Sequence, residues 1–111
     1  MAGRSAQACI EACDACAAAC NRCAAACLRE SDVAAMARSI ALDIDCAAAC
    51  QFTAAAAARS SELLGAISAL CADVCDACSA ECEKHRLDHC QACAAACRRC
   101  AEACQAMSVG G

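Results

Sequence analysis

One kind of apolar residue recurs along the chain at alternating steps of four and three positions, separated mostly by alanine and polar residues. That residue is cysteine, at positions 9, 13, 16, 20, 23 and 27 in the first stretch. The alternation returns at 71, 75, 78 and 82 and at 90, 93, 97, 100 and 104, whereas Cys46 and Cys50 form a separate pair. An average step of 3.5 residues keeps such a stripe on one side of a slightly supercoiled helix, whereas a strand requires a period of two.

Polar breaks set the ends of the first two predicted helices. The first helix is expected from about Ser5 to Arg29. Ser31 or Asp32 can then accept hydrogen bonds from the first free backbone N–H groups of a second helix, which is expected to reach about Arg59.

Further polar breaks open the last two predicted helices. The segment 60–62, Ser-Ser-Glu, begins a third helix that is expected to end near residues 84–86. Asp88, with Gln91 three residues later, resembles a capping box, and the fourth helix should end before Gly110. Four long helices joined by very short turns predict an all-α, up-down-up-down antiparallel four-helix bundle that forms one domain over residues 1–111.

Composition strengthens the helical interpretation and sets the nature of the core. Alanine is abundant and proline is absent, which favours helices. The inward stripe of a bundle usually carries leucine and isoleucine, but here cysteine occupies it, so the expected core is lined by cysteine. The chain has 17 cysteines in 111 residues.

Charge and hydropathy restrict the partners and the compartment. The formal net charge of −4 and the absence of basic runs argue against nucleic acid. No stretch has the ~18 consecutive apolar residues of a membrane span, and residues 1–13 lack the apolar core of a signal peptide. We therefore expect a cytoplasmic protein, in which thiols stay reduced and serve metals or catalysis before disulfides.

Eight pairs of cysteines are spaced four residues apart, and only Cys90 is left over. Such residues have Cβ atoms about 5–6 Å apart on a helix, whereas a disulfide needs about 3.5–4.5 Å. Pairs within one helix are therefore suited to hold one metal ion between two sulfurs. The pairs are 9/13, 16/20, 23/27, 46/50, 71/75, 78/82, 93/97 and 100/104.

The softness of thiolate and the charge of the core favour Cu(I) among the possible metals. Thiolate selects Cu(I), Zn(II) or iron–sulfur clusters, and the last two usually take four ligands from loops. One Cu(I) per thiolate leaves an apolar core neutral, so we expect multiple ions, approaching one per cysteine, with sulfurs that bridge helices.

Four other interpretations compete with copper binding. Buried cysteines can be merely small apolar side chains. The cysteines could instead form interhelical disulfides, or could buffer zinc or cadmium. A thiol redox protein would carry C-x-x-C at a helix N-terminus, whereas the steps 13/16 and 20/23 fall inside a predicted helix. No catalytic motif stands out, and we expect no enzymatic activity.

Two segments, ALDIDCAAAC at 41–50 and ECEKHRLDHCQACAAACRRCAEAC at 81–104, resemble the cytosolic copper storage proteins. The resemblance covers essentially the whole chain. It implies a four-helix bundle, generally a homotetramer, that holds many Cu(I) ions, protects against free copper and can supply copper enzymes. The alanine-rich surface at 54–58 is compatible with oligomers. The implied metal ligands are Cys9, Cys13, Cys16, Cys20, Cys23, Cys27, Cys46, Cys50, Cys71, Cys75, Cys78, Cys82, Cys90, Cys93, Cys97, Cys100 and Cys104.

The predicted topology brings candidate copper ligands together at one end of the bundle. His85 and His89 fall in the turn before the fourth helix, near Met36, and with them we expect Cys27, Cys82 and Cys90. Histidine and methionine also bind copper, so this end is a candidate copper entrance. The alternative is that both histidines are merely exposed in a polar turn.

Two further expectations concern Asp43 and the opposite end. Asp43 precedes Cys46 by three residues and is a candidate oxygen ligand, although a solvated or arginine-paired carboxylate is the simpler interpretation. The opposite end should be closed by an apolar plug. Its expected members are Cys9, Cys104, Met107, Phe52, Leu63, Leu64 and Ile67.

Overall fold

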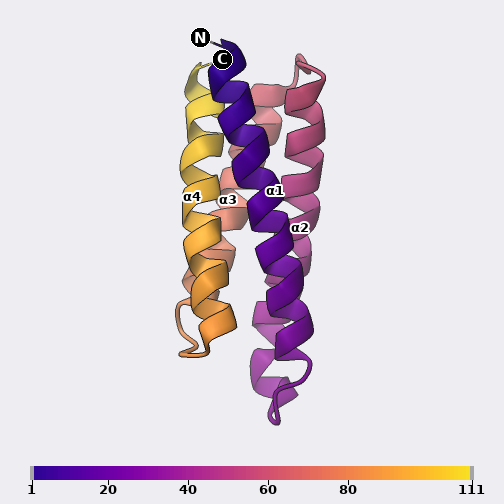
Figure 1. Cartoon of the computed structure of the whole chain (residues 1–111), viewed down its shortest axis with the longest axis vertical. Helices are drawn as coiled ribbons and strands as arrows, with labels where there is room; N and C mark the ends of the chain where they lie inside the picture. The colour runs from indigo at the N-terminus through magenta and orange to yellow at the C-terminus, as the bar shows by residue number, and fades with distance from the viewer. Residues whose placement is uncertain (1, 111) are drawn as a thin grey trace.

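The computed structural model describes residues 2–110, and the side chains of residues 5–108. Four α-helices follow one another: α1 (Ala2–Cys27), α2 (Ala37–Ala58), α3 (Leu64–Cys82) and α4 (Asp88–Gly110). A short 3-10 helix, η1 (Val33–Met36), precedes α2. Successive helices run in opposite directions (Figure 1). Each helix packs against the helices next to it in sequence, and α1 also packs against α4. The predicted all-α bundle is confirmed, and no strand occurs within residues 2–110.

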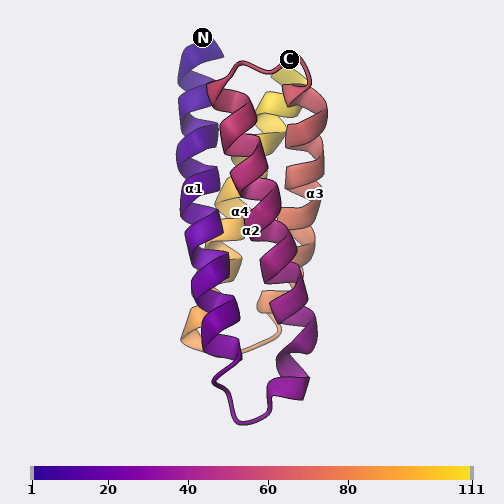
Figure 2. The same cartoon turned by 90° about the vertical axis from the view of Figure 1, so that its right-hand side faces the viewer.

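The two ends of the bundle differ in outline. The loop between α1 and α2 extends beyond the turn between α3 and α4, while the described ends of the chain lie together at the opposite end (Figures 1 and 2). We call the end with the α1–α2 loop and the α3–α4 turn the histidine end, because residues 85 and 89 belong to it. The opposite end is called the terminal end.

Two helix starts differ from the prediction because local hydrogen bonds hold the chain outside the helix. Asp32 caps η1, with its Oδ1 accepting from the Ala35 N–H at 3.3 Å, so α2 begins only at Ala37. Ser60 ends α2 in a left-handed conformation with φ 54°, and the Ser61 N–H donates back to the Ala56 carbonyl at 2.9 Å. This helix-terminating arrangement delays α3 to Leu64.

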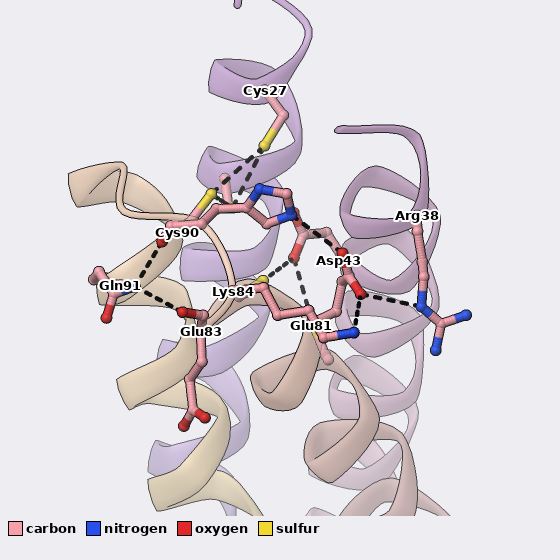
Figure 3. A network of polar contacts seen from close by, with 12 residues as sticks. Cys27, Arg38, Asp43, Glu81, Glu83, Lys84, Cys90 and Gln91 are labelled. Atoms are coloured by element: carbon pink, nitrogen blue, oxygen red, sulfur yellow. Dashed lines mark hydrogen bonds and ion pairs between the residues drawn. The ribbon is translucent and has the colours of Figure 1, made fainter. Parts of the chain in front are cut away.

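The predicted capping box at the start of α4 is wrong, because Asp88 is itself the first residue of the helix and Gln91 bonds elsewhere. The Gln91 side-chain amide donates to the carbonyls of His85, at 2.6 Å, and Glu83, at 3.3 Å (Figure 3). Gln91 therefore closes the α3–α4 turn by satisfying carbonyls at the end of α3, rather than bonding to the start of its own helix.

Cysteine and alanine form the core, as predicted. All 17 cysteine side chains have no exposed surface. The inward face of α2 continues the alternation of three and four residues with other side chains, which explains why only two cysteines occur there. The buried positions on that face are Met36, Ser39, Asp43, Cys46, Cys50, Thr53 and Ala57.

The apolar plug expected at the terminal end is wrong in two members. Phe52 is 51% exposed and Leu63 is 62% exposed. Phe52 lies one position off the inward face of α2, where Thr53 is buried instead, and Leu63 precedes the first turn of α3. Leu64, Ile67 and Met107 are only partly buried, and the fully buried residue of α3 at this end is Ser68.

Candidate metal centre: a column of cysteine thiols

The cysteine sulfurs line the bundle axis as a column. Fourteen of the Sγ atoms lie 3.6–4.0 Å from at least one other, and Cys23, Cys27 and Cys90 form a separate set among them. All 17 cysteines are free thiols. A disulfide would need about 2.05 Å between sulfurs. We call these 17 side chains the thiol column.

Contacts between helices are as close as those within a helix. The Cys16 and Cys20 sulfurs, spaced four residues apart on α1, lie 3.9 Å from each other, whereas Cys16 lies 3.7 Å from Cys97 on α4. The two-sulfur sites predicted within single helices are thus parts of larger groups. Cys46 and Cys50 on α2 meet Cys75 on α3 at 3.7 and 3.9 Å.

Several groups of four ligand atoms lie within 4.8 Å of one another. They share members: Cys16, Cys20, Cys46 and Cys97 each belong to two of the groups. A sulfur that belongs to two groups can bridge two metal ions. Four of the groups consist of cysteine alone: Cys13/Cys71/Cys100/Cys104, Cys16/Cys46/Cys50/Cys75, Cys16/Cys20/Cys46/Cys97 and Cys20/Cys78/Cys93/Cys97.

Asp43 lies inside the thiol column, so the expectation of a solvated or arginine-paired carboxylate is wrong. Its side chain has no exposed surface. Its Oδ1 accepts from the thiols of Cys78 and Cys93 at 3.3 Å and of Cys82 at 3.6 Å. Its Oδ2 has no partner among the described residues. Burial raises the pKa of Asp43 to about 9, because an ionised carboxylate in a dry core lacks solvation.

At the histidine end, one of the two predicted histidines joins the column. His89 Nδ1 lies 3.7 Å from the sulfur of Cys23, 3.9 Å from that of Cys27 and 3.6 Å from that of Cys90. Its Nε2 lies 3.2 Å from Oε2 of Glu30. We call Cys23, Cys27, Cys90 and His89 the mouth site; Cys27 and Cys90 are labelled in Figure 3.

His85 turns away from the sulfurs and joins a buried carboxylate that sequence reasoning missed. Its Nε2 lies 3.1 Å from Glu81 Oε2, while Arg38 and Lys84 contact Glu81 Oε1 at 3.1 and 3.3 Å (Figure 3). Burial opposes ionisation, but these hydrogen bonds hold the pKa of Glu81 below its usual value. The cluster ties α2 to the end of α3. Met36, the other candidate at this end, is buried in the core.

Burial keeps thiols at the histidine end protonated when no metal is present. It raises the pKa of Cys27, and that of Cys90 to about 12. Metal ions bind the thiolate, so binding must release protons. A neutral column that exchanged one proton for each monovalent cation would therefore remain close to neutral as it filled.

The fold and the site define a class of protein, a four-helix bundle whose interior is lined by thiols in groups that could hold several metal ions. The family model described as copper storage protein matches residues 2–109. The chain belongs to the copper storage protein family, which confirms the resemblance seen in the sequence.

Relatives and solved structures agree with this family. A cysteine-rich protein of Bacillus subtilis, YhjQ, is 48% identical over 103 residues, which are 93% of this chain and 95% of that protein. The Cu(I)-bound structure of the B. subtilis copper storage protein BsCsp3 matches with a TM-score of 0.90 and 48% identity, covering 94% of this chain and 98% of that one. A cytosolic copper storage protein of Streptomyces lividans, solved with five coppers, matches with a TM-score of 0.92 and 42% identity, covering 98% of both chains.

Proposed function

We propose that this protein stores multiple Cu(I) ions on the thiol column. The observation that carries the proposal is the sharing of sulfurs between neighbouring four-atom groups, because shared sulfurs allow bridged clusters rather than isolated sites. The Cu(I)-bound BsCsp3 structure supports the identity of the metal.

Charge favours Cu(I) over divalent metals in most of the column. A Zn(II) ion on four thiolates leaves a net charge of −2, which is costly in a core buried from solvent. One Cu(I) per thiolate leaves no net charge, and a soft d¹⁰ ion accepts two or three sulfurs. Zinc or cadmium buffering is therefore the weaker alternative, and a thiol redox role lacks a C-x-x-C pair at a helix N-terminus.

The proposed ligands are the 17 cysteines, with Asp43 and His89 as an oxygen and a nitrogen ligand in contact with them. We further propose that copper enters at the histidine end, where Met36 and His85 lie near the path without a described contact to a sulfur. Residues 1–111 then act as one copper-binding domain without enzymatic activity.

The proposed setting is the cytoplasm, where the protein would limit free copper and could supply copper enzymes. The cytosolic S. lividans relative supports this compartment. No α-helix within residues 2–110 is long and apolar enough to cross a bilayer. Nucleic acid is not a proposed partner, because the net charge is −4.

A homo-oligomer, a tetramer by family resemblance, is the proposed assembly. Large apolar side chains remain exposed on α2 and near the start of α3, namely Ile44, Phe52, Leu63 and Leu70. Light scattering coupled to size exclusion would measure the mass. A monomer across the micromolar range would contradict the proposal.

Anaerobic titration of the reduced full chain with Cu(I), against a chromogenic Cu(I) chelator, tests the storage function. We expect cooperative uptake that saturates near one ion per cysteine, that is, near 17 per chain. Saturation at one or two ions, or displacement of the copper by equimolar zinc, would contradict storage.

A further inference from the structure

The mouth site adds an imidazole nitrogen to three sulfurs, whereas the non-sulfur donor deeper in the column is the Asp43 carboxylate. Three sulfurs and one imidazole nitrogen, from Cys23, Cys27, Cys90 and His89, lie within 4.8 Å of one another. The four all-cysteine groups described above offer sulfur alone. Three cysteines and one histidine are one of the usual ligand sets of tetrahedral Zn(II).

The spacing of these four atoms fits a tetrahedral divalent ion. With Zn–S near 2.3 Å and Zn–N near 2.0–2.1 Å, a tetrahedral site needs sulfurs about 3.8 Å apart and sulfur–nitrogen distances of about 3.5 Å. The sulfur–sulfur distances are 3.9 Å for Cys23–Cys27, 3.9 Å for Cys23–Cys90 and 4.0 Å for Cys27–Cys90. The sulfur–nitrogen distances to His89 are 3.6–3.9 Å. Shifts of a few tenths of an ångström would close the site.

A carboxylate lies behind the imidazole, as it commonly does behind a metal-ligating histidine. His89 Nε2 lies 3.2 Å from Glu30 Oε2, so an Nε2–H donated to Glu30 leaves Nδ1 unprotonated and facing the three sulfurs. A carboxylate behind a ligating histidine fixes the ring orientation and raises its basicity. Sequence spacing did not predict this partner, because Glu30 lies 59 residues from His89.

Charge and solvent exposure also make the mouth site a better place for a divalent ion than the interior of the column. Zn(II) on three thiolates and a neutral imidazole leaves −1, compared with −2 on four thiolates. The His89 and Glu30 side chains are 23% and 34% exposed, whereas every cysteine is fully buried. Water can therefore screen the residual charge at the mouth site, but not deeper in the column.

We propose that the mouth site binds one Zn(II) ion, and that bound zinc slows the loading of copper through the histidine end. As the ion binds, three S–H bonds break and release their protons to solvent, three Zn–S bonds and one Zn–N bond form, and the water ligands of the ion leave. The second part of the proposal rests on the proposed storage of Cu(I), whereas zinc binding itself does not.

Cobalt(II) provides the spectroscopic probe for zinc binding in the reduced, metal-free full chain. We expect one equivalent of Co(II) to give tetrahedral ligand-field bands with thiolate charge transfer, and Zn(II) to displace it at equal stoichiometry. His89→Ala should abolish this discrete site, and Glu30→Gln should weaken it by about tenfold or more. The matched control is His85→Ala, which removes an imidazole that contacts Glu81 instead of sulfur.

Three results would overturn zinc binding: no tetrahedral spectrum, several equivalents bound without distinction, or equal effects of His89→Ala and His85→Ala. Circular dichroism of each variant separates loss of the site from loss of the helices.

Stopped-flow measurement of Cu(I) uptake tests whether bound zinc slows copper loading. Zinc-loaded wild type should load more slowly than zinc-free wild type, while His89→Ala should be indifferent to zinc. Equal rates for the two wild-type forms would overturn slowing by zinc, whereas absence of copper uptake in zinc-free protein would contradict storage alone.

Discussion

The sulfurs of Cys50 and Cys100 lie 3.6 Å apart, although their helices, α2 and α4, stand diagonally opposite in the bundle. Such contact across a diagonal is possible because the core side chains are mostly cysteine and alanine, which let all four helices approach the axis. The sulfurs therefore form one column in the centre instead of separate seams between neighbouring helices.

The central position of Cys50 predicts that replacing different cysteines lowers the Cu(I) capacity by different amounts. Cys50 contacts Cys71, Cys75 and Cys100 at 3.6–3.9 Å, so its thiolate should bridge ions. Cys50→Ser should lower the Cu(I) capacity by more than one ion per chain. The same change at Cys9, at the terminal end, should cost one ion or fewer. Anaerobic titration measures both, and equal losses would contradict bridging through Cys50.

The buried Asp43 carboxyl predicts that the metal-free protein is more stable in acid than in mild alkali. Burial raises the pKa of Asp43 from 3.8 in the unfolded chain to about 9 in the folded protein. The neutral carboxyl therefore contributes fully to stability below pH 3.8, and this contribution is lost as the pH rises toward 9. The slope from this group is at most about 1.4 kcal/mol per pH unit. Asp43→Asn should flatten the profile and raise stability at pH 8. Urea unfolding of reduced protein between pH 5 and 8.5 tests this, and parallel profiles would contradict it.

The Glu81 cluster predicts the opposite pH dependence. Burial raises the pKa of Glu81, but hydrogen bonds from His85 and Lys84 outweigh burial and lower this pKa below 4.5, the unfolded value. The contribution of ionised Glu81 to the stability of the fold is therefore present above pH 4.5. It is lost as the pH falls through the lower folded pKa. Glu81→Ala should cost about 1–2 kcal/mol at neutral pH, since charged hydrogen bonds of a buried carboxylate are removed.

Thermal or urea unfolding measures the cost of Glu81→Ala. Glu83→Ala serves as the control, because Glu83 forms a half-exposed pair with Arg98 and should matter less. Equal losses in the two variants would contradict a special role for Glu81.

Ser68 predicts that the thiol column can be lengthened by one residue. It occupies the next inward position of α3 before Cys71, and its fully buried Oγ has no partner in the described part of the chain. Ser68→Cys should stabilise the metal-free protein by about 1 kcal/mol, because an unsatisfied polar atom is replaced by sulfur. It should also add copper capacity at the terminal end.

Ser79→Cys is the matched control for Ser68→Cys. The Ser79 hydroxyl already donates to the Asp76 carbonyl at 3.1 Å, and the residue lies off the inward stripe. We expect no gain in capacity and a small loss of stability. A gain in both variants would mean that any added thiol binds copper, irrespective of its place in the bundle.

The cysteine stripes could be predicted from the sequence because one residue type repeats at the helical period. The inward face of α2 could be predicted only in part. The spacing of Asp43 from Cys46 indicates its place on the stripe, whereas Ser39 and Thr53 are ordinarily surface residues and their type does not mark a buried position. The contact between Glu30 and His89 depends on how α1 ends relative to α4, which no local pattern encodes. Topology and apolar character together predict Phe52 and Leu63 in a plug at the terminal end, but their positions lie outside the inward faces and they are exposed.

The alternation of three and four residues also limits how such a chain can change its length during evolution. One residue inserted within α1 would rotate everything beyond it by about 100° and carry the following cysteines out of the core. A seven-residue insertion would preserve their direction but would shift them along the axis, past their partners on the other helices. Only the α1–α2 loop, the α2–α3 connection and the helix ends can absorb insertions freely. Within the helices, related chains should therefore differ by substitution, with gaps confined to the connections.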